Sequence, residues 1–214
     1  DHAIELQERA VAYLNTDGNS RGFVNIGGSH VLERFFNQII EEVRDPRMDI
    51  SLKERKRADL KLNSNSEQKQ RDAEKRSDIR INPLGSGSDY TPFLQHLGIA
   101  SANIAFGGGG GGGSYNTLYD TYGRYTTWRD PGLVYGVSLA QVAGRATLRL
   151  ANSQRLPFEF SGFVDNIDLY ISELEDLADT MRKDTSKQNN RIADGTYAAA
   201  LDPTKTIVPP KIKD

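Results

Sequence analysis

An aspartate at the end of an apolar run is the first residue of this 214-residue chain that could support chemistry. Asp17 directly follows the apolar run 11–16 and precedes Gly18, so we expect it at the carboxyl end of a buried strand. Open α/β sheets place functional groups at these strand ends. The alternative is a structural role, in which the Asp17 side chain caps the turn by accepting hydrogen bonds from backbone amides.

A glycine–serine loop at residues 85–89 (Gly-Ser-Gly-Ser-Asp) precedes a short helical pattern that ends at Gly98. Such a loop at a helix start could bind an anion through its backbone N–H groups. Its glycine spacing and its lack of lysine match neither the phosphate-binding loop nor the dinucleotide fingerprint. A helix cap without any ligand is the alternative.

The chain has no cysteine and three histidines, His2, His30 and His96. A disulfide framework, cysteine-ligated zinc or iron–sulfur sites and cysteine nucleophiles are therefore excluded for these residues. Neither a His-Glu-x-x-His motif nor a Gly-x-Ser-x-Gly elbow with a later histidine occurs. No complete catalytic set follows from residue chemistry alone. We expect the histidines to lie in a frayed helix, on the surface near a helix start and in a helix, respectively.

The charge balance limits the classes of partner. A net charge of −2 argues against a nucleic-acid-binding protein, and no apolar run approaches the roughly 20 residues of a transmembrane helix. Residues 53–80 combine ten Lys/Arg with six Asp/Glu, which favours an exposed loop with some helical turns, with a basic docking patch as the alternative. The first residues read as a helix already under way, so we expect the chain to begin inside a longer protein.

The elements that position these residues follow from the spacing of apolar side chains, which predicts an α/β domain followed by helices. The predicted elements are strands at 11–16 and 99–106 and helices at 29–44 (with Ser29 as N-cap), 132–152, 163–181 and 186–201, followed by an extended tail at 203–210. Seven consecutive glycines, 107–113, either close around a ligand or have no fixed conformation. The tyrosines between 115 and 125 predict a half-buried aromatic stripe.

Several motifs occur in the order seen in one known family. They are residues 6–17 (LQERAVAYLNTD), 84–90 (LGSGSDY), 93–101 (FLQHLGIAS), 150–153 (LANS) and 156–158 (LPF). Together they resemble the family of glutamate carboxypeptidase II, the transferrin receptor and their bacterial relatives among the co-catalytic zinc peptidases. The resemblance covers most of residues 3–160.

The resemblance implies a fold and an assembly. Residues 1–155 would be the C-terminal part of the α/β/α sandwich of a zinc peptidase, and residues 156–214 the start of an α-helical dimerisation domain. A homodimer through the helical region, and an extracytoplasmic or secreted location, are further implications. No nucleic-acid partner and no membrane segment are expected in this chain.

The resemblance also implies metal ligands. Active members of the family bind two zinc ions, which activate a shared water for attack on a peptide carbonyl. By resemblance, Asp17 is a zinc ligand, whereas Asn116 occupies the position of a histidine ligand. An amide oxygen is a poor substitute for imidazole at zinc. The other ligands and the general-base glutamate would precede Asp1, so we name no catalytic residue in this chain.

Substrate contacts are implied for the glycine–serine loop and one tyrosine. Ser86, Gly87 and Ser88 would line the peptide-binding site, and Tyr115 would lie beside the reaction centre. The family's arginine patch for acidic residues falls near Asn103 and Ala105, so acidic specificity is not implied. The predicted function is that of a fragment or variant of a bacterial-type zinc exopeptidase whose site is incomplete here. The alternative is a non-catalytic scaffold or dimerisation protein resembling the transferrin receptor.

Overall fold

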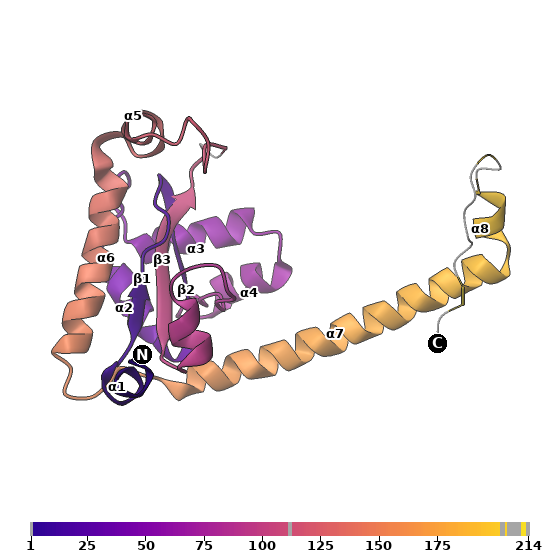
Figure 1. The fold of residues 1–214 in the computed structure, drawn as a ribbon, viewed down its shortest axis with the longest axis horizontal. Coiled ribbons are helices and arrows are strands. Elements are labelled where there is room, and N and C mark those ends of the chain that lie inside the picture. The colour runs from indigo at the N-terminus through magenta and orange to yellow at the C-terminus, as the bar shows by residue number, and fades with distance from the viewer. Residues whose placement is uncertain (1, 111–112, 202–203, 205–210, 213–214) are drawn as a thin grey trace. The chain divides into compact units, whose positions relative to one another are not determined.

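The computed structural model describes residues 2–110, 113–201, 204 and 211–212 (Figure 1). These residues belong to two compact units, Asp1–Phe163 and Val164–Asp214. The first unit contains a sheet with helices packed against it, and the second contains most of one long helix. The described part of the chain is therefore mixed α/β, with helices following the strands.

The sheet has three strands in the order β1-β3-β2: β1 (Tyr13–Asn15), β2 (Gly22–Gly28) and β3 (Ser101–Gly108). β1 runs parallel to β3, whereas β2 is antiparallel to it. The predicted strands at 11–16 and 99–106 are confirmed as β1 and β3. β2 is an addition that the apolar spacing did not predict, because glycines occupy three of its seven positions.

Helices precede, separate and follow the strands along the chain. They are α1 (Ala3–Arg9), η1 (His30–Leu32), α2 (Glu33–Glu42), α3 (Leu52–Asn63), α4 (Glu67–Lys75), the π-helix η2 (Pro92–His96), α5 (Tyr122–Arg124), the π-helix η3 (Tyr125–Arg129), η4 (Pro131–Leu133), α6 (Val134–Ala151), α7 (Phe160–Ala193) and α8 (Thr196–Ala199). The predicted helices at 29–44 and 132–152 are confirmed as η1–α2 and η4–α6. Ser29 is the N-cap residue of η1, as predicted, but its hydroxyl bonds to no amide of the helix and instead accepts the backbone N–H of Ser101 at 3.1 Å.

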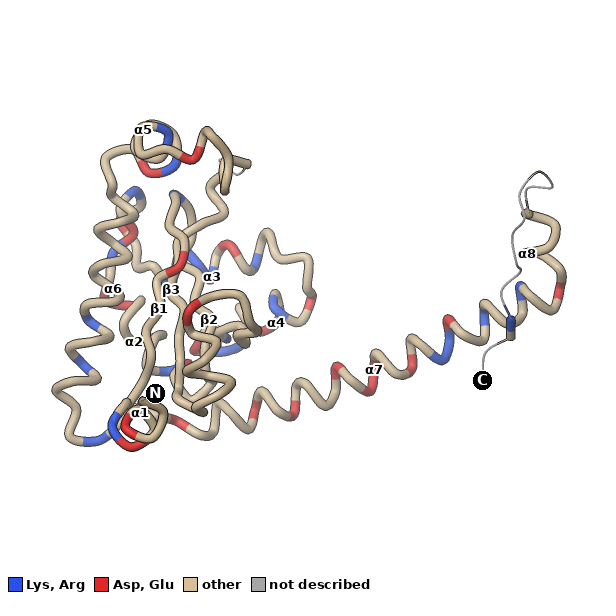
Figure 2. The backbone as a smooth tube through the Cα atoms, viewed as in Figure 1, with Lys and Arg blue, Asp and Glu red and all other residues tan. Residues whose placement is uncertain are grey.

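The charged segment 53–80, expected as an exposed loop with some helical turns, forms α3 and α4, and Figure 2 shows Lys and Arg interleaved with Asp and Glu along it. Ser51 and Glu54 form a reciprocal capping box at the start of α3. The Arg57 guanidinium donates to the carbonyls of Ala73 and Arg76 at 2.8 and 2.7 Å. These bonds satisfy carbonyls at the end of α4 and hold the two helices together.

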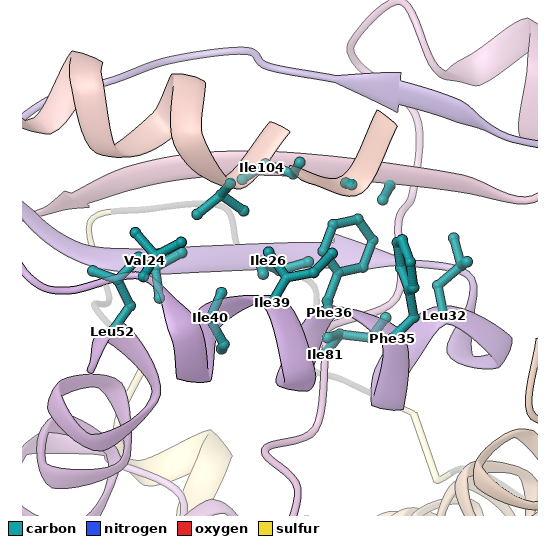
Figure 3. Close-up of a cluster of buried hydrophobic side chains, with 14 of the residues drawn as sticks. Val24, Ile26, Leu32, Phe35, Phe36, Ile39, Ile40, Leu52, Ile81 and Ile104 are labelled. Carbon is teal, nitrogen blue, oxygen red and sulfur yellow. The ribbon is translucent and has the colours of Figure 1, made fainter. Parts of the chain in front are cut away.

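The core lies between α2, α6 and the sheet. Phe36 and Ile39 of α2 are fully buried and point toward Ile104 of β3 and Ile26 of β2 (Figure 3). Tyr135 and other apolar residues of α6 join the same cluster. The spacing of apolar residues along α2 places them on one face of the helix, which is why this face packs on the sheet.

The second unit consists largely of α7, which continues without a break through Ala193. The sequence pattern predicts a break before residue 186, but the structure shows only a turn at Gly195, whose φ is 78°, before α8. The expected tail at 203–210 lies outside the described residues except for Thr204. No described helix is both long and apolar enough to cross a membrane.

His30 was expected at the surface, but the structure buries it, with 8% of the residue exposed. Burial, and secondarily the nearby positive charge of Arg80, lowers the pKa of His30 below 6.5. The unfolded chain therefore binds more protons than the folded one just below pH 6.5, and the folded state loses stability as the pH falls through this window.

We therefore expect the free energy of unfolding of wild type, relative to His30→Gln, to decrease as the pH is lowered from about 7.5 to 5.5. Urea denaturation at a series of pH values measures this difference. His96→Gln, at an exposed position, controls for the loss of a histidine. A difference between wild type and His30→Gln that stays constant with pH would contradict the expectation.

Candidate functional site

Two asparagines and an aspartate meet where the parallel strands β1 and β3 lie side by side. Asn15, the last residue of β1, pairs in register with Asn103. The side-chain oxygen of Asn103 accepts hydrogen bonds from Asn15 Nδ2 at 3.0 Å and from the backbone N–H of Asp17 at 3.1 Å. Asn103 thereby fixes the chain as it leaves β1. The predicted location of Asp17, just after a strand, is confirmed.

Ser88 connects this strand end to the glycine–serine loop. Asn15 Nδ2 donates to Ser88 Oγ at 3.0 Å, and Ser88 Oγ donates to Asp17 Oδ2 at 2.6 Å. Because Ser88 accepts from Asn15, its single hydroxyl hydrogen can point at Asp17. Among the described residues, no donor lies within hydrogen-bonding distance of Asp17 Oδ1. The Asp17 carboxylate is thus held through one oxygen and exposes the other.

This geometry bears on the turn-capping role considered for Asp17. Its carboxylate accepts from the Ser88 hydroxyl, and in the described part of the chain no backbone amide donates to it. The turn-capping role is therefore wrong. Asp17 is exposed at a strand end with one unbonded oxygen, an arrangement that suits a cation or a polar ligand.

The loop at 85–89 places its three candidate substrate residues differently. Ser88 is half-buried against Asp17, whereas Ser86 and Gly87 are exposed. The backbone N–H of Gly87 donates to Thr91 Oγ1 at 3.3 Å, so this amide is already engaged within the loop. The contact between Ser88 and Asp17 links the loop directly to the candidate ligand.

Tyr115 and Asn116 follow the glycine run. Tyr115 is 79% exposed, and Asn116 adopts a left-handed conformation with φ 55°. The backbone N–H of Asn116 donates to Asp120 Oδ2 at 3.3 Å. Within the described residues, no hydrogen bond joins either of them to Asp17 or Ser88. Asp17 and Ser88 are therefore hydrogen-bonded to each other, and no hydrogen bond in the described part of the chain connects them to Tyr115 or Asn116.

A complete metal centre does not arise from the described residues. They contain no group of three or more His, Cys, Asp or Glu side chains arranged to hold a metal ion. Asp17 offers one carboxylate oxygen, and Asn116 offers an amide where zinc sites use imidazole. The described residues thus fit a single ligand position and not a two-zinc centre.

The first glycines of the run 107–113 have a defined conformation. Gly107 and Gly108 end β3, where Gly108 pairs with Gly22. The backbone N–H of Gly109 donates to the Arg21 carbonyl at 3.1 Å, and Arg21 Nε donates to the Gly109 carbonyl at 2.9 Å. Residues 111–112 lie outside the described residues, so the two alternatives for the run stay predictions, although its first glycines pair with β2 and Arg21.

The tyrosines after the glycine run do not form the expected half-buried stripe. Tyr119 is 71% and Tyr122 is 77% exposed. Tyr125 is the exception, since its hydroxyl accepts a hydrogen bond from Asn19 Nδ2 at 2.8 Å. That bond attaches η3 to the loop between β1 and β2, close in sequence to Asp17.

Asn15 and Asn103 are the members of the site that the sequence interpretation missed. Both interrupt otherwise apolar strands, and a polar side chain within a buried strand needs a hydrogen-bonding partner. A polar residue within each apolar strand was therefore the sequence signal that could have indicated their role in the site. Their pairing could not be predicted, because it depends on the register between β1 and β3.

Comparisons with known proteins identify the class. No family model matches the chain. It is 30% identical over 83% of its length to the probable glutamate carboxypeptidase VP8 of Zea mays, and 28% identical over 79% to the probable glutamate carboxypeptidase LAMP1 of Arabidopsis thaliana. It is also 30% identical over 51% of its length to the aminopeptidase NAALADL1 of Mus musculus. The chain is therefore a homologue of the glutamate carboxypeptidase-like proteins, which confirms the resemblance seen in its motifs.

The match covers only part of those relatives. The chain spans 23% of the length of VP8 and of LAMP1 and 15% of NAALADL1. The similarity to a peptidase family thus concerns only one part of each relative's length. It does not establish that this chain has the activity of a whole relative.

Proposed function

We propose that this chain contributes one metal ligand and part of the substrate-binding surface to a zinc-dependent exopeptidase that hydrolyses peptides. The observation that carries the proposal is the Asp17 carboxylate, held through Oδ2 by Ser88 with Oδ1 exposed at the carboxyl end of β1. Its relatives are named as glutamate carboxypeptidases and an aminopeptidase, which supports hydrolysis of a peptide bond as the reaction.

In this proposal Asp17 Oδ1 holds the metal, and Asn103 and Ser88 keep the carboxylate in place. In the protein that contains this chain, two zinc ions held mostly by residues outside it would supply an activated water for attack on the peptide carbonyl. Ser86, Gly87 and Ser88 line the substrate site, with Tyr115 beside it. Because the described residues provide one ligand position and no general base, we propose that this chain alone does not hydrolyse peptides.

The open edge of β1 supports the proposed sandwich fold. Among the described residues, β1 pairs with β3 only, so its other edge is available to a further strand. Parallel strands are characteristic of sheets covered by helices on both faces. We propose that this sheet is part of the α/β/α sandwich of a zinc peptidase.

The test is zinc binding in the protein that contains this chain, followed by calorimetric titration of the metal-depleted form. We expect Asp17→Ala to remove a ligand and lower zinc affinity by about 100-fold or more, and Ser88→Ala to lower it by roughly 10-fold to 100-fold through loss of the orienting hydrogen bond. Ser88→Thr keeps the hydroxyl and is the matched control. Unchanged zinc affinity in Asp17→Ala would refute the proposal.

Hydrolysis of a dipeptide panel by the 214-residue chain itself tests the incomplete site. We expect no turnover above the level of a chelator-treated sample. Tight binding of two zinc ions together with turnover that a chelator abolishes would show that the chain is complete.

A non-catalytic scaffold or interaction protein is the second candidate, and Asn116 favours it. An amide at a histidine position removes a strong zinc ligand. Asn116→His in the protein that contains this chain separates the two: a gain of zinc affinity and turnover indicates a disabled peptidase, and the absence of both indicates a scaffold.

The same family relationship supports two further proposals, one on the oligomeric state and one on the cellular location. We propose a homodimer through the helical region 156–214, measured as molar mass by light scattering. We also propose an extracytoplasmic or secreted location, which fractionation of the producing cells tests.

A further inference from the structure

A threonine just outside the glycine–serine loop holds the backbone of that loop. The Thr91 hydroxyl donates to the Ser88 carbonyl at 2.8 Å and accepts from the Gly87 backbone N–H at 3.3 Å. A hydroxyl has one hydrogen and two lone pairs, so it can make both bonds at once. The two bonds hold the Gly87–Ser88 dipeptide at both ends, and the Ser88 side chain projects from this dipeptide.

The segment that carries Thr91 is attached to β1. Thr91 directly precedes η2. The Phe93 ring of η2 stacks on the Tyr13 ring, with centroids 4.0 Å apart and ring planes 10° apart. The Phe93 carbonyl also accepts the backbone N–H of Ile99, which is buried. Because Tyr13 opens β1, the strand that leads to Asp17 also supports the segment that holds the loop.

A second side chain closes the loop at its start. The side-chain amide of Gln95, in η2, donates to the Gly85 carbonyl at 2.6 Å. The Ser88 hydroxyl takes no part in any of these bonds, so it remains available to Asn15 and Asp17. The bonds made by Thr91 and Gln95 thus present the Ser88 hydroxyl to the candidate ligand.

We propose that Thr91 is a positioning residue for the Asp17 carboxylate and acts through Ser88. This inference rests on the proposed function, in which Asp17 binds zinc. Every bond between Thr91 and Asp17 joins described residues of the first unit. Without the Thr91 hydroxyl, the Ser88 hydroxyl loses its single fixed position, and the orientation of the carboxylate is lost with it. Metal affinity depends on such an orientation.

Two substitutions separate the hydroxyl from the rest of the Thr91 side chain. Thr91→Val keeps the branched shape and removes the hydroxyl, whereas Thr91→Ser keeps the hydroxyl. We expect little change in the free energy of unfolding for either variant, because water can bond to the groups that Thr91→Val frees in this partly exposed loop. Thr147→Val is the matched control, since the Thr147 hydroxyl donates to the Ala143 carbonyl at 2.9 Å within α6.

The first measurement requires no metal and uses the 214-residue chain. The side-chain amide of Asn15 donates to Ser88 Oγ and to Asn103 Oδ1, so its N–H signals in nitrogen–proton NMR spectra report the position of the Ser88 hydroxyl. We expect Thr91→Val to move these signals toward their positions in Ser88→Ala. Thr91→Ser and Thr147→Val should leave them as in wild type. Unchanged signals in Thr91→Val would overturn the inference.

The second measurement is the zinc affinity of the protein that contains this chain. We expect Thr91→Val to lower it by about threefold to tenfold, less than Ser88→Ala does, because the Thr91 backbone N–H still donates to the Ser88 carbonyl at 3.0 Å. Thr91→Ser should restore the wild-type affinity. In a Ser88→Ala background, Thr91→Val should cause no further loss, because it acts through the hydroxyl that is already absent.

The outcomes distinguish positioning from a structural role. An equal loss of zinc affinity from Thr91→Val with and without Ser88→Ala would overturn the inference, as would a lower melting temperature with unchanged zinc affinity. Zinc affinity that Asp17→Ala leaves unchanged refutes the proposed function instead. The Asn15 signals still decide in that case whether Thr91 positions Ser88, so the two proposals fail separately.

Discussion

Gly22→Ala is expected to destabilise the first unit by about 3 kcal/mol or more, a large fraction of the stability of a typical domain. Gly22 opens β2 with φ 141°, a conformation that L residues rarely adopt. A Cβ atom there would lie 2.1 Å from the Gly107 carbonyl oxygen and 2.6 Å from the Gly109 nitrogen. Both are backbone atoms, so relief requires β2 and β3 to separate.

The matched control for this substitution is Gly144→Ala. Gly144 lies within α6, where an added Cβ would meet nothing within 4 Å. Alanine favours a helix over glycine by roughly 0.8–1.0 kcal/mol, so this variant should be as stable as wild type or more so. Urea denaturation followed by circular dichroism measures both. Equal midpoints for the two variants would show that β2 tolerates a side chain at its start.

Arg55→Met is expected to cost about 3–5 kcal/mol, because it leaves a buried carboxylate without its counter-ion. The Arg55 guanidinium pairs with Asp45, whose side chain is fully buried. It also donates to the Tyr135 hydroxyl at 3.2 Å and lies 5.0 Å from the centre of the Phe23 ring. One side chain thus connects α3 to the turn after α2, to α6 and to β2.

A second change separates the charge from the packing. Asp45→Asn combined with Arg55→Met removes both charges, so we expect it to be less destabilised than the sum of the single variants. Arg71→Met is the control for an exposed pair: Arg71 and its partner Glu67 are 52% and 87% exposed, and pairs of this kind contribute about 0–1 kcal/mol. Equal losses in Arg55→Met and Arg71→Met, measured by urea denaturation, would mean that the buried pair contributes no more than a surface pair.

The sequence predicted elements wherever apolar periodicity was strong. The helix through Phe36 and Ile39 and the strand before Asp17 follow from such patterns, and the structure confirms both. β2 was not predicted, because its glycines obscure the alternation of apolar and polar side chains along the strand. One of them is required by tertiary contact, since a Cβ at Gly28 would lie 2.7 Å from the Ser101 carbonyl oxygen. Periodicity describes one segment, whereas this requirement arises from a strand far along the chain.

The candidate site was predictable to a similar extent. The motifs indicated Asp17 and the loop containing Ser88, and the structure brings these two side chains into contact. The supporting asparagines were not predictable, because Asn15 and Asn103 are separated by 88 positions and meet only through strand register. Residue types in a sequence indicate a candidate functional side chain more readily than they indicate the residues that hold it in place.

The strand order of the sheet has a consequence for how the chain folds. β3 is the central strand and also the last of the three in sequence. Among the described residues, β1 and β2 do not pair with each other, and each pairs along its length with residues 101–108 of β3. Contacts between such distant segments slow folding, because the loop must close before the pairing stabilises it. During synthesis, helices such as α2 can therefore form before the sheet does, because the sheet cannot assemble until its central strand β3 has left the ribosome.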